Sequence, residues 1–300
     1  MNLLLRRLRR RDLTDHEGEY EHVAAGETLA ALAAGAHLEI IPMKSIDGAI
    51  AALPPGANVT VTCSPAAGIA ETQRRTERLV ADGFHVIPHV AARLVTSPSH
   101  AAELAAWVRS LGLDEVFVIA GDAPEAAGPY EGALGFLRDF LAADPGVDRI
   151  GVPGYPDGHP IISAEVASEQ LHAKQTLVDE AGVGAWVSTQ MCFDTERIVS
   201  WLSAERARGL HLPVRLGVAG VVDRTRLLKV GMRLGVGASM RFLSKNSSAV
   251  TKLVAPGGYD PSELLAPLAA DAERLDIESL HVFTFNSVAD TVDWQNALTA

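Results

Sequence analysis

The chain has 300 residues, of which 48% are hydrophobic and 21% are charged, and its formal net charge is −11. This length suits one large globular domain, and so acidic a body disfavours nucleic acid as a partner. No apolar run reaches the roughly 18 residues of a membrane-spanning helix, and Cys63 and Cys192 have no disulfide or zinc spacing. We therefore expect a cytoplasmic protein that binds neither nucleic acid nor a membrane.

The first twelve residues form a basic patch with five arginines and one aspartate. Its leucines have helical spacing, so a solvated helix is the simplest interpretation. An arm that touches a neighbouring subunit, a phosphate-rich ligand or RNA is the alternative. The stretch lacks the longer apolar segment and cleavage site of a secretory signal. We expect a basic, helical N-terminal extension over residues 1–36, and a homo-oligomer is left open.

Short β-rich runs alternate with helical segments over the rest of the chain. The expected strands are 37–42, 58–63, 84–89, 115–121, 149–154, 185–190, 213–218 and 280–285, and helical segments include 99–111, 163–181, 223–237, 239–254 and 261–275. Repeated strand and helix units build a parallel sheet. Eight units favour a closed barrel over an open doubly wound sheet. The sequence therefore predicts an α/β fold, a single-domain (β/α)8 TIM barrel over residues 37–300, with function at the C-terminal strand ends.

The first strand, "HLEIIP", places an acid among apolar residues. Alternation puts His37, Glu39 and Ile41 on one face. If that face points into the barrel, Glu39 lies near the mouth in an apolar cavity. Because burial disfavours a charged carboxylate, such a group holds its proton more tightly and can act as a general acid. A structural glutamate paired with a lysine or arginine of the barrel is the alternative.

Two further strand ends carry polar side chains. The fourth strand ends in "IAGDAP", and alternation from Val116 and Val118 predicts that the Asp122 carboxylate reaches the mouth. An Asx cap on the next turn is the alternative. Gln190 closes the sixth strand, where its amide offers a donor and an acceptor to the edge of a heterocycle. A core glutamine bonded to backbone is the alternative there.

The fifth strand leads into the loop "GYPDGHP", residues 154–160. Its prolines and glycines fix a tight turn that presents Tyr155, Asp157 and His159 at low entropic cost. Taken alone, the loop indicates only a turn. The loop becomes informative when it is combined with the other strand ends.

Two patterns that resemble ligand sites have simpler explanations. His85 and His89 share a face of the third strand, and Cys63 could be imagined as a third metal ligand. No ligand spacing supports this, so we expect no metal. The glycines of "GMRLGVGAS", residues 231–239, lack a preceding strand and a Lys-Ser/Thr pair. Close helix packing is therefore the expected reason for them.

Five motifs together resemble the methylenetetrahydrofolate reductase family over residues 37–290. They are "LEIIP", "IAGDAP", "GYPDGHP", "VSTQMCFD" and "HVFTFN", each at a strand end and in the family's order. The resemblance implies a TIM barrel that reduces 5,10-methylenetetrahydrofolate to 5-methyltetrahydrofolate. It implies that Glu39 is the general acid that helps to open the five-membered ring to a reactive iminium. The other implied contacts are Asp122, Gln190 and Phe285 to the substrate, and Thr62, His89, Tyr155 and His159 to the cofactor.

The chain departs from the family where the flavin would usually bind. Ala120 replaces the arginine before Gly-Asp, and "CSPAAG", "LVDEAG" and "LGVAG" replace three other family stretches. Losing these contacts removes charge-assisted hydrogen bonds to a dinucleotide. The pattern is therefore most similar to the flavin-independent actinobacterial branch, which implies NADH as the direct hydride donor. The alternatives are an FAD-dependent reductase, a tetrahydrofolate-dependent methyl-transferring relative, and a folate-binding barrel without turnover.

Overall fold

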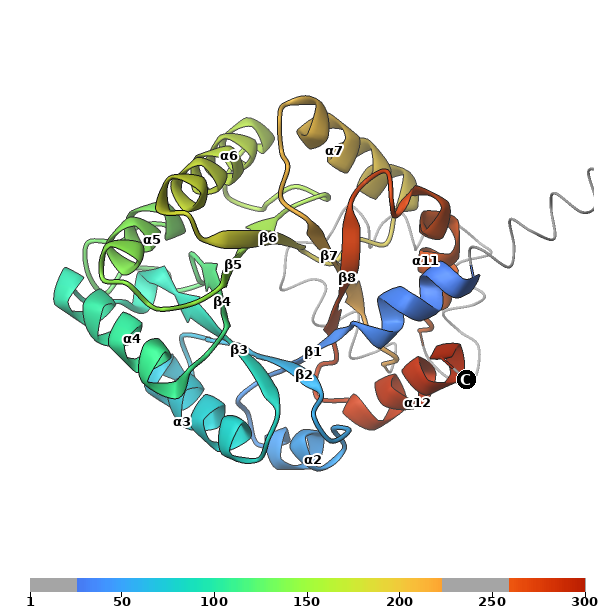
Figure 1. The fold of residues 1–300 in the computed structure, drawn as a ribbon, viewed down its shortest axis with the longest axis horizontal. Coiled ribbons are helices and arrows are strands. Elements are labelled where there is room, and N and C mark those ends of the chain that lie inside the picture. The colour runs from blue at the N-terminus through green and yellow to red at the C-terminus, as the bar shows by residue number, and fades with distance from the viewer. Residues whose placement is uncertain (1–25, 223–258, 300) are drawn as a thin grey trace, which may run out of the picture.

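The computed structural model describes residues 26–222 and 259–299 and contains a closed barrel of eight parallel strands in sequence order (Figure 1). The strands are β1 His37–Ile40, β2 Asn58–Val61, β3 His85–Ala91, β4 Glu115–Ile119, β5 Arg149–Gly154, β6 Gly184–Thr189, β7 Val214–Ala219 and β8 Ile277–Phe283. The predicted TIM barrel is thereby confirmed. β1 and β2 end two residues before their predicted limits, and β8 begins three residues earlier than predicted.

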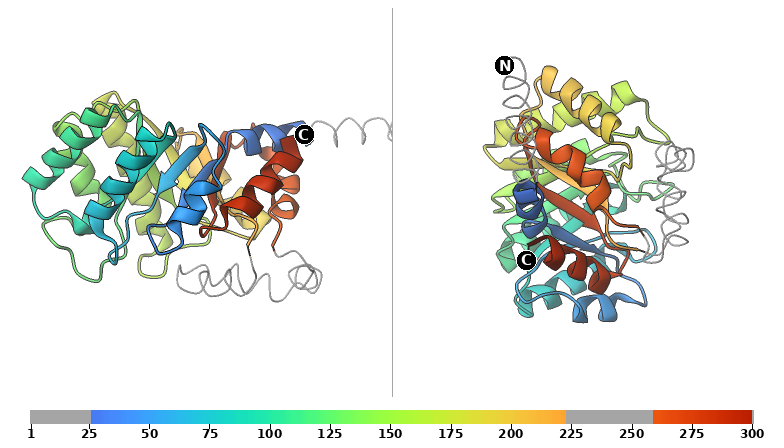
Figure 2. Two further views of the ribbon diagram at one scale, coloured as in Figure 1. Left: turned by 90° about the horizontal axis from the view of Figure 1, so that it is seen from below. Right: turned by 90° about the vertical axis from the view of Figure 1, so that its right-hand side faces the viewer.

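Helices form the outer layer on all sides of the barrel (Figures 1 and 2). They are α2 Ile46–Ala51, α3 Gly68–Ala81, α4 Pro98–Leu111, α5 Ala133–Ala142, α6 Ala164–Ala181, α7 Thr195–Ala207, α11 Ser262–Leu268 and α12 Val288–Thr299, with 3-10 turns at Ala92–Leu94 and Ala269–Asp271. Side-chain caps fix several of the starts. Ser97, Ser163 and Asp194 accept hydrogen bonds from the first turns of α4, α6 and α7.

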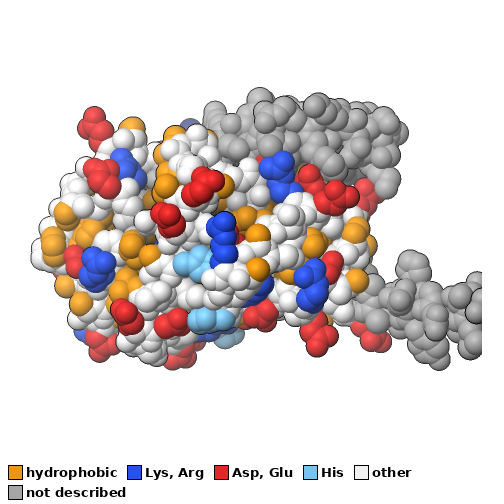
Figure 3. Space-filling view, turned by 90° about the horizontal axis from the view of Figure 1, so that it is seen from above, with side chains coloured by type: hydrophobic (Ala, Val, Ile, Leu, Met, Phe, Trp, Pro, Cys, Tyr) orange, Lys and Arg blue, Asp and Glu red, His pale blue; other side chains and the backbone are white. Residues whose placement is uncertain are grey.

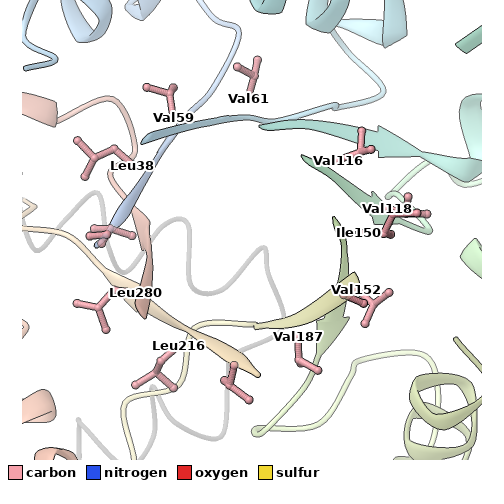
Figure 4. Close-up of a cluster of buried hydrophobic side chains, with 14 of the residues drawn as sticks. Leu38, Val59, Val61, Val116, Val118, Ile150, Val152, Val187, Leu216 and Leu280 are labelled. Carbon is pink, nitrogen blue, oxygen red and sulfur yellow. The ribbon is translucent and has the colours of Figure 1, made fainter. Parts of the chain in front are cut away.

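The two faces of each strand have different surroundings. One face, which includes Leu38, Val59, Val116 and Leu280, points outward into the layer between sheet and helices (Figure 4). These branched and aliphatic side chains are almost fully buried and form the main core. Because side chains alternate along a strand, the intervening residues face the barrel interior. Glu39 belongs to that inner set, as predicted from "HLEIIP".

Residues 26–34 form a helix that precedes β1. Leu29, Leu32 and Ala33 of this helix are buried in the main core. The Gln295 side-chain amide of α12 donates a 2.6 Å hydrogen bond to the Ala33 carbonyl. The described part of the N-terminal extension therefore packs as an integral element of the barrel. The basic patch, the segments 223–237 and 239–254, and "GMRLGVGAS" lie outside the described residues.

An ion-pair network lies at the N-terminal end of the barrel interior. The Arg215 guanidinium, 4% exposed, donates to both Glu115 carboxylate oxygens at 2.6 and 2.7 Å and to Glu278 at 2.9 Å. Arg149 donates two more hydrogen bonds to Glu278, at 2.8 and 2.9 Å. The Arg215 guanidinium also lies 4.0 Å from the centre of the Trp186 ring. Paired charges therefore line this end of the barrel.

Gly151 on β5 makes room for the Trp186 ring. A Cβ atom at Gly151 would overlap the Trp186 indole, and it would lie 2.7 Å from the Phe117 ring. Glycine is therefore required here by a close approach of side chains inside the barrel.

The described surface mixes charged and hydrophobic side chains (Figure 3). Basic and acidic side chains are interspersed on the side of the barrel seen in Figure 3. Among the described residues, no helix combines the length and apolar character needed to cross a membrane.

Candidate active site

Glu39 lies inside the barrel with two histidines. Its Oε2 atom lies 3.0 Å from Nε2 of His281, a hydrogen bond whose donor is set by the His281 tautomer. The Nε2 atom of His89 is 3.8 Å from the same oxygen, too far for a hydrogen bond. All three residues are more than nine-tenths buried, with exposures of 6%, 5% and 2% for Glu39, His89 and His281. The partners of Glu39 are therefore imidazoles, whereas the sequence had offered a lysine or arginine as the structural alternative.

Aromatic rings surround this acid and its histidines. The Phe117 ring lies edge-on to His89 with 4.7 Å between centroids, and the Phe283 ring is 4.9 Å from His281. Burial, and then the neighbouring His281, hold the pKa of His89 well below its usual range. His89 is therefore a neutral imidazole near pH 7, and the interior around Glu39 is shielded from water.

The segment after β8 fixes the end of β1. The Asn286 side chain accepts a 2.8 Å hydrogen bond from the Ile41 backbone N–H and donates a 3.0 Å hydrogen bond to its carbonyl. The Thr284 hydroxyl donates a 2.5 Å bond to the Glu39 carbonyl. Because a side chain satisfies Ile41, no neighbouring strand pairs there, which explains the early end of β1. These contacts hold the Glu39 backbone in place.

An apolar cluster covers the C-terminal ends of β6, β7 and β8. It consists of Met191, Phe193, Ala219, Val222, Tyr259 and Phe285, with Ile41 and Phe283 packed against it. Phe285, a predicted substrate contact, is 2% exposed here and has a left-handed backbone with φ of 51°. Met191 and Phe193 were not singled out from the sequence, although they belong to the motif "VSTQMCFD". The mouth is therefore lined by apolar groups on this side.

Three of the predicted polar residues gather at the mouth from neighbouring loops. The rings of Tyr155 and His159 meet edge-to-face with 4.8 Å between centroids. Burial and the Asp122 charge raise the pKa of Tyr155 to about 12. Burial lowers the pKa of His159, and the Asp122 charge opposes that shift. The Asp122 carboxylate therefore lies close enough to act electrostatically on both rings. Asp122 belongs to the loop after β4, whereas Tyr155 and His159 belong to the loop after β5.

Gln190 joins this group through the backbone. Its N–H donates a 2.8 Å hydrogen bond to the Gly154 carbonyl, and its side-chain oxygen accepts one of 2.9 Å from the Met191 N–H. The structure thereby places Gln190 beside the start of the "GYPDGHP" loop. Asp157 of that loop, with a 2% exposed side chain, is held by Arg197 at 3.2 Å. Asp157 therefore anchors the loop.

Asp122 reaches its position by a route that alternation did not predict. Val116 and Val118 point outward to the helices (Figure 4), so their face does not lead to the mouth. β4 ends at Ile119, and Gly121 has a left-handed φ of 88°. A Cβ at Gly121 would also lie 2.8 Å from the Ala91 Cβ. The turn at Gly121 resets the direction of the chain before Asp122.

Thr62 and His89 each offer a buried polar atom to the interior. Thr62 Oγ1 and His89 Nε2 are both buried and have no hydrogen-bond partner among the described residues, and the same holds for Thr60 Oγ1. Buried polar atoms are ordinarily paired. Unpaired atoms on the inner face of neighbouring strands therefore fit a site that a ligand completes. Thr62 and His89, both predicted to contact the cofactor, are therefore among the residues with an unpaired buried atom.

Arg93, in the 3-10 turn after β3, has a structural role in the loop after β4. Arg93 donates side-chain hydrogen bonds to the carbonyls of Ala123, Pro124 and Glu131, between 2.8 and 3.0 Å. Its backbone N–H also bonds to the Ala120 carbonyl at 2.9 Å. Arg93 is therefore occupied in shaping this loop, and it does not replace the cationic group missing at Ala120.

His281 is the functional candidate that the sequence did not single out. It lies in "HVFTFN", but only the closed barrel places it beside Glu39. One ligand atom from each of Glu39, His89 and His281 lies within 4.8 Å of the other two, an arrangement that could hold a metal ion. The sequence analysis considered only His85, His89 and Cys63 as metal ligands. The group in the structure shares His89 with that set but otherwise consists of different residues.

Comparison with known proteins finds similarity to a curated yeast protein. The chain is 29% identical over 126 residues to methylenetetrahydrofolate reductase 2 of Saccharomyces cerevisiae (strain ATCC 204508 / S288c). The match covers 39% of this chain and 20% of the yeast protein, so the chain spans about one fifth of the length of that curated relative. No protein-family model matches the chain. The match supports a distant relation to the methylenetetrahydrofolate reductase family.

Proposed function

We propose that this chain is an oxidoreductase that reduces 5,10-methylenetetrahydrofolate to 5-methyltetrahydrofolate, with NADH as the direct hydride donor and Glu39 as the general acid. The observation that carries the proposal is the buried Glu39 at the centre of a barrel whose sequence partly matches a protein named as such a reductase. A cytoplasmic location belongs to the same proposal.

In the proposed reaction, Glu39 gives its proton to N10 of the folate. The bond between N10 and the methylene carbon breaks, which leaves an iminium at N5. A hydride from C4 of the nicotinamide then adds to the methylene carbon, so that NADH becomes NAD⁺ and the methyl group forms. The Glu39 carboxylate afterwards regains a proton from water. His281 holds the Glu39 carboxyl in one orientation through their 3.0 Å contact, which favours proton transfer.

The mouth residues would bind and orient the two reactants. Asp122 and Gln190 offer acceptor and donor groups to the pterin ring, and Phe285 contributes to the apolar wall. Because its pKa is raised to about 12, Tyr155 stays protonated and can donate a hydrogen bond. Tyr155 and His159 would contact the nicotinamide cofactor, with Thr62 and His89 on the opposite strands.

Direct transfer from NADH is favoured over a bound flavin by the loop after β4, where the described residues offer no unpaired cation. Ala120 has no charge, and the nearby Arg93 donates its hydrogen bonds to backbone carbonyls and to the Glu131 carboxylate. A tightly held flavin dinucleotide would therefore lack charge-assisted hydrogen bonds at this loop. NADH needs fewer of these contacts, because it binds and leaves in each turnover. FAD is the alternative cofactor, and it would use Tyr155 and His159 as ring contacts.

An assay on purified protein tests the proposal. NADH oxidation should depend on added methylenetetrahydrofolate, with 5-methyltetrahydrofolate formed in equal amount and without added flavin. The visible spectrum of the same sample should show no flavin band after gel filtration. A retained flavin band would support the FAD-dependent alternative. Methyl transfer to tetrahydrofolate without NADH use would support the methyl-transferring relative, and folate binding without turnover would contradict an enzyme.

A further inference from the structure

A carboxyl group and two imidazoles converge inside the barrel from three strands. Glu39 comes from β1, His89 from β3 and His281 from β8. Within the described residues, they form the one group of three or more such side chains whose ligand atoms lie close enough to share an ion. All three are more than nine-tenths buried. The group is therefore built into the fold and does not arise from a chance meeting of surface side chains.

The spacing of the ligand atoms suits a small transition-metal ion. With bonds of about 2.0–2.1 Å, neighbouring ligands of a tetrahedral Zn²⁺ lie about 3.3 Å apart. The separations of 3.0 Å and 3.8 Å from the Glu39 oxygen to the two imidazole nitrogens lie on either side of this value. The widest separation is at most 4.8 Å. A rotation of the His89 ring that moves its Nε2 atom by about 1.5 Å would bring this widest separation to the tetrahedral spacing.

His89 supplies an independent sign of a missing partner. Its Nε2 atom faces Glu39, is buried, and has no hydrogen-bond partner among the described residues. An unpaired nitrogen of this kind costs free energy unless something binds it.

We propose that Glu39, His89 and His281 bind one divalent transition-metal ion of the Zn²⁺ class, and that the bound ion inhibits the reductase. The inhibitory part rests on the proposed function. The ion takes the oxygen of Glu39 that would carry the acidic proton, and that proton leaves to water. Without a proton on Glu39, the folate ring is not opened. Two nitrogens and one carboxylate oxygen favour Zn²⁺ over Mg²⁺ or Ca²⁺, which prefer oxygen ligands.

Another histidine and glutamate pair provides a matched control. His172 Nε2 lies 2.9 Å from Glu205 Oε2 between α6 and α7, and Glu205 is also buried. This pair has the same chemistry and nearly the same distance as His281 with Glu39. It belongs to no group of three metal-ligating side chains within the described residues. His172→Asn therefore removes a comparable pair outside the proposed site.

The test measures Zn²⁺ binding to the full, metal-free chain by calorimetry, with no folate or NADH present. We expect one saturable ion per chain, weakened about 10-fold or more by His281→Asn or His89→Asn, and unaffected by His172→Asn. Mg²⁺ should not compete. X-ray absorption of the Zn²⁺-loaded natural protein should show two imidazole ligands and no sulfur, a readout that does not depend on any variant folding.

Three results would overturn the site. They are no saturable Zn²⁺ binding up to about 100 μM, equal binding by the natural protein and the two site variants, or a sulfur ligand from Cys63 or Cys192. A reductase assay then tests the second part. Activity should fall as the site fills, and full activity with Zn²⁺ bound would contradict inhibition. Because binding is measured without substrates, its outcome is separate from that of the proposed reaction.

Discussion

Glu39 combines an apolar setting with a single strong hydrogen-bond partner. Its carboxyl is 6% exposed and lies 3.0 Å from His281. Glutamine has the same shape and can keep a hydrogen bond to His281, but it carries no acidic proton. We therefore expect Glu39→Gln to leave folate affinity within a few-fold and to lower kcat by about 10² or more.

The experiment on Glu39 pairs steady-state kinetics with a folate-binding titration. Glu103→Gln, at an exposed position of α4, is the matched control and should behave as the natural protein. Unaltered turnover in Glu39→Gln would exclude Glu39 as the acid. A loss of folate affinity equal to the loss of kcat/KM would instead assign Glu39 to binding.

Lys174 is a second buried charge, and it makes stability depend on pH. It lies on the inner side of α6 with 5% exposure, and burial lowers its pKa from 10.5 to about 8. The unfolded chain therefore binds more protons than the native chain between about pH 8 and 10.5, so the free energy of unfolding rises with pH in that window. Below pH 8, keeping the charged amine buried costs about 3 kcal/mol.

Lys174→Met should therefore raise the free energy of unfolding at pH 7 by up to about 3 kcal/mol, and the gain should shrink as the pH rises above 8. Urea unfolding at pH 7 and pH 9.5 measures both values. Lys44→Met, at an exposed position, should change neither. An equal effect of Lys174→Met at the two pH values would show that its amine is not desolvated.

At the scale of elements, the network around Arg215 joins β4, β7 and β8 at the closed end of the barrel. Removing Arg215 leaves the Glu115 carboxylate without its two strongest hydrogen bonds. Breaking a buried pair by removing one partner costs about 3–5 kcal/mol. We expect Arg215→Met to lower the free energy of unfolding by about that amount, as measured in urea.

The control for Arg215 is Arg274→Met. Arg274 also pairs with a carboxylate, that of Asp271, but its side chain is 54% exposed. Exposed pairs contribute about 0–1 kcal/mol, so the control should stay near the natural value. A similar loss in both variants would show that burial does not set the strength of the Arg215 network.

The elements were predictable where a local pattern determines them. Strand and helix periods, and caps such as Ser163 before α6, depend on nearby residues, so the barrel and the shared face of His37 and Glu39 followed from sequence. Strand ends depend on distant partners. Asn286 ends β1 from 245 residues away, and the left-handed Gly121 redirects the chain before Asp122. The alternation of inward and outward side chains along a strand predicts neither the end of β1 nor the turn before Asp122.

At the scale of the whole molecule, barrel closure creates the site. β8 pairs with β1, with His281 in register with His37, and this brings His281 to Glu39 across 242 residues of chain. No spacing rule joins residues so far apart, so the histidine partner could not be predicted from a single sequence. In the proposed function, folate and NADH would meet at the C-terminal mouth, the end at which TIM-barrel enzymes carry their active sites.

Direct hydride transfer inside this barrel is the central claim, and isotope transfer tests it most directly. The measurement uses NADH deuterated at both C4 positions and follows the label in the methyl group of 5-methyltetrahydrofolate by mass spectrometry. We predict one deuterium per product molecule, because the hydride passes straight from nicotinamide to the methylene carbon. A methyl group that takes its new hydrogen from water would contradict direct transfer, since hydrogen on a reduced flavin exchanges with solvent.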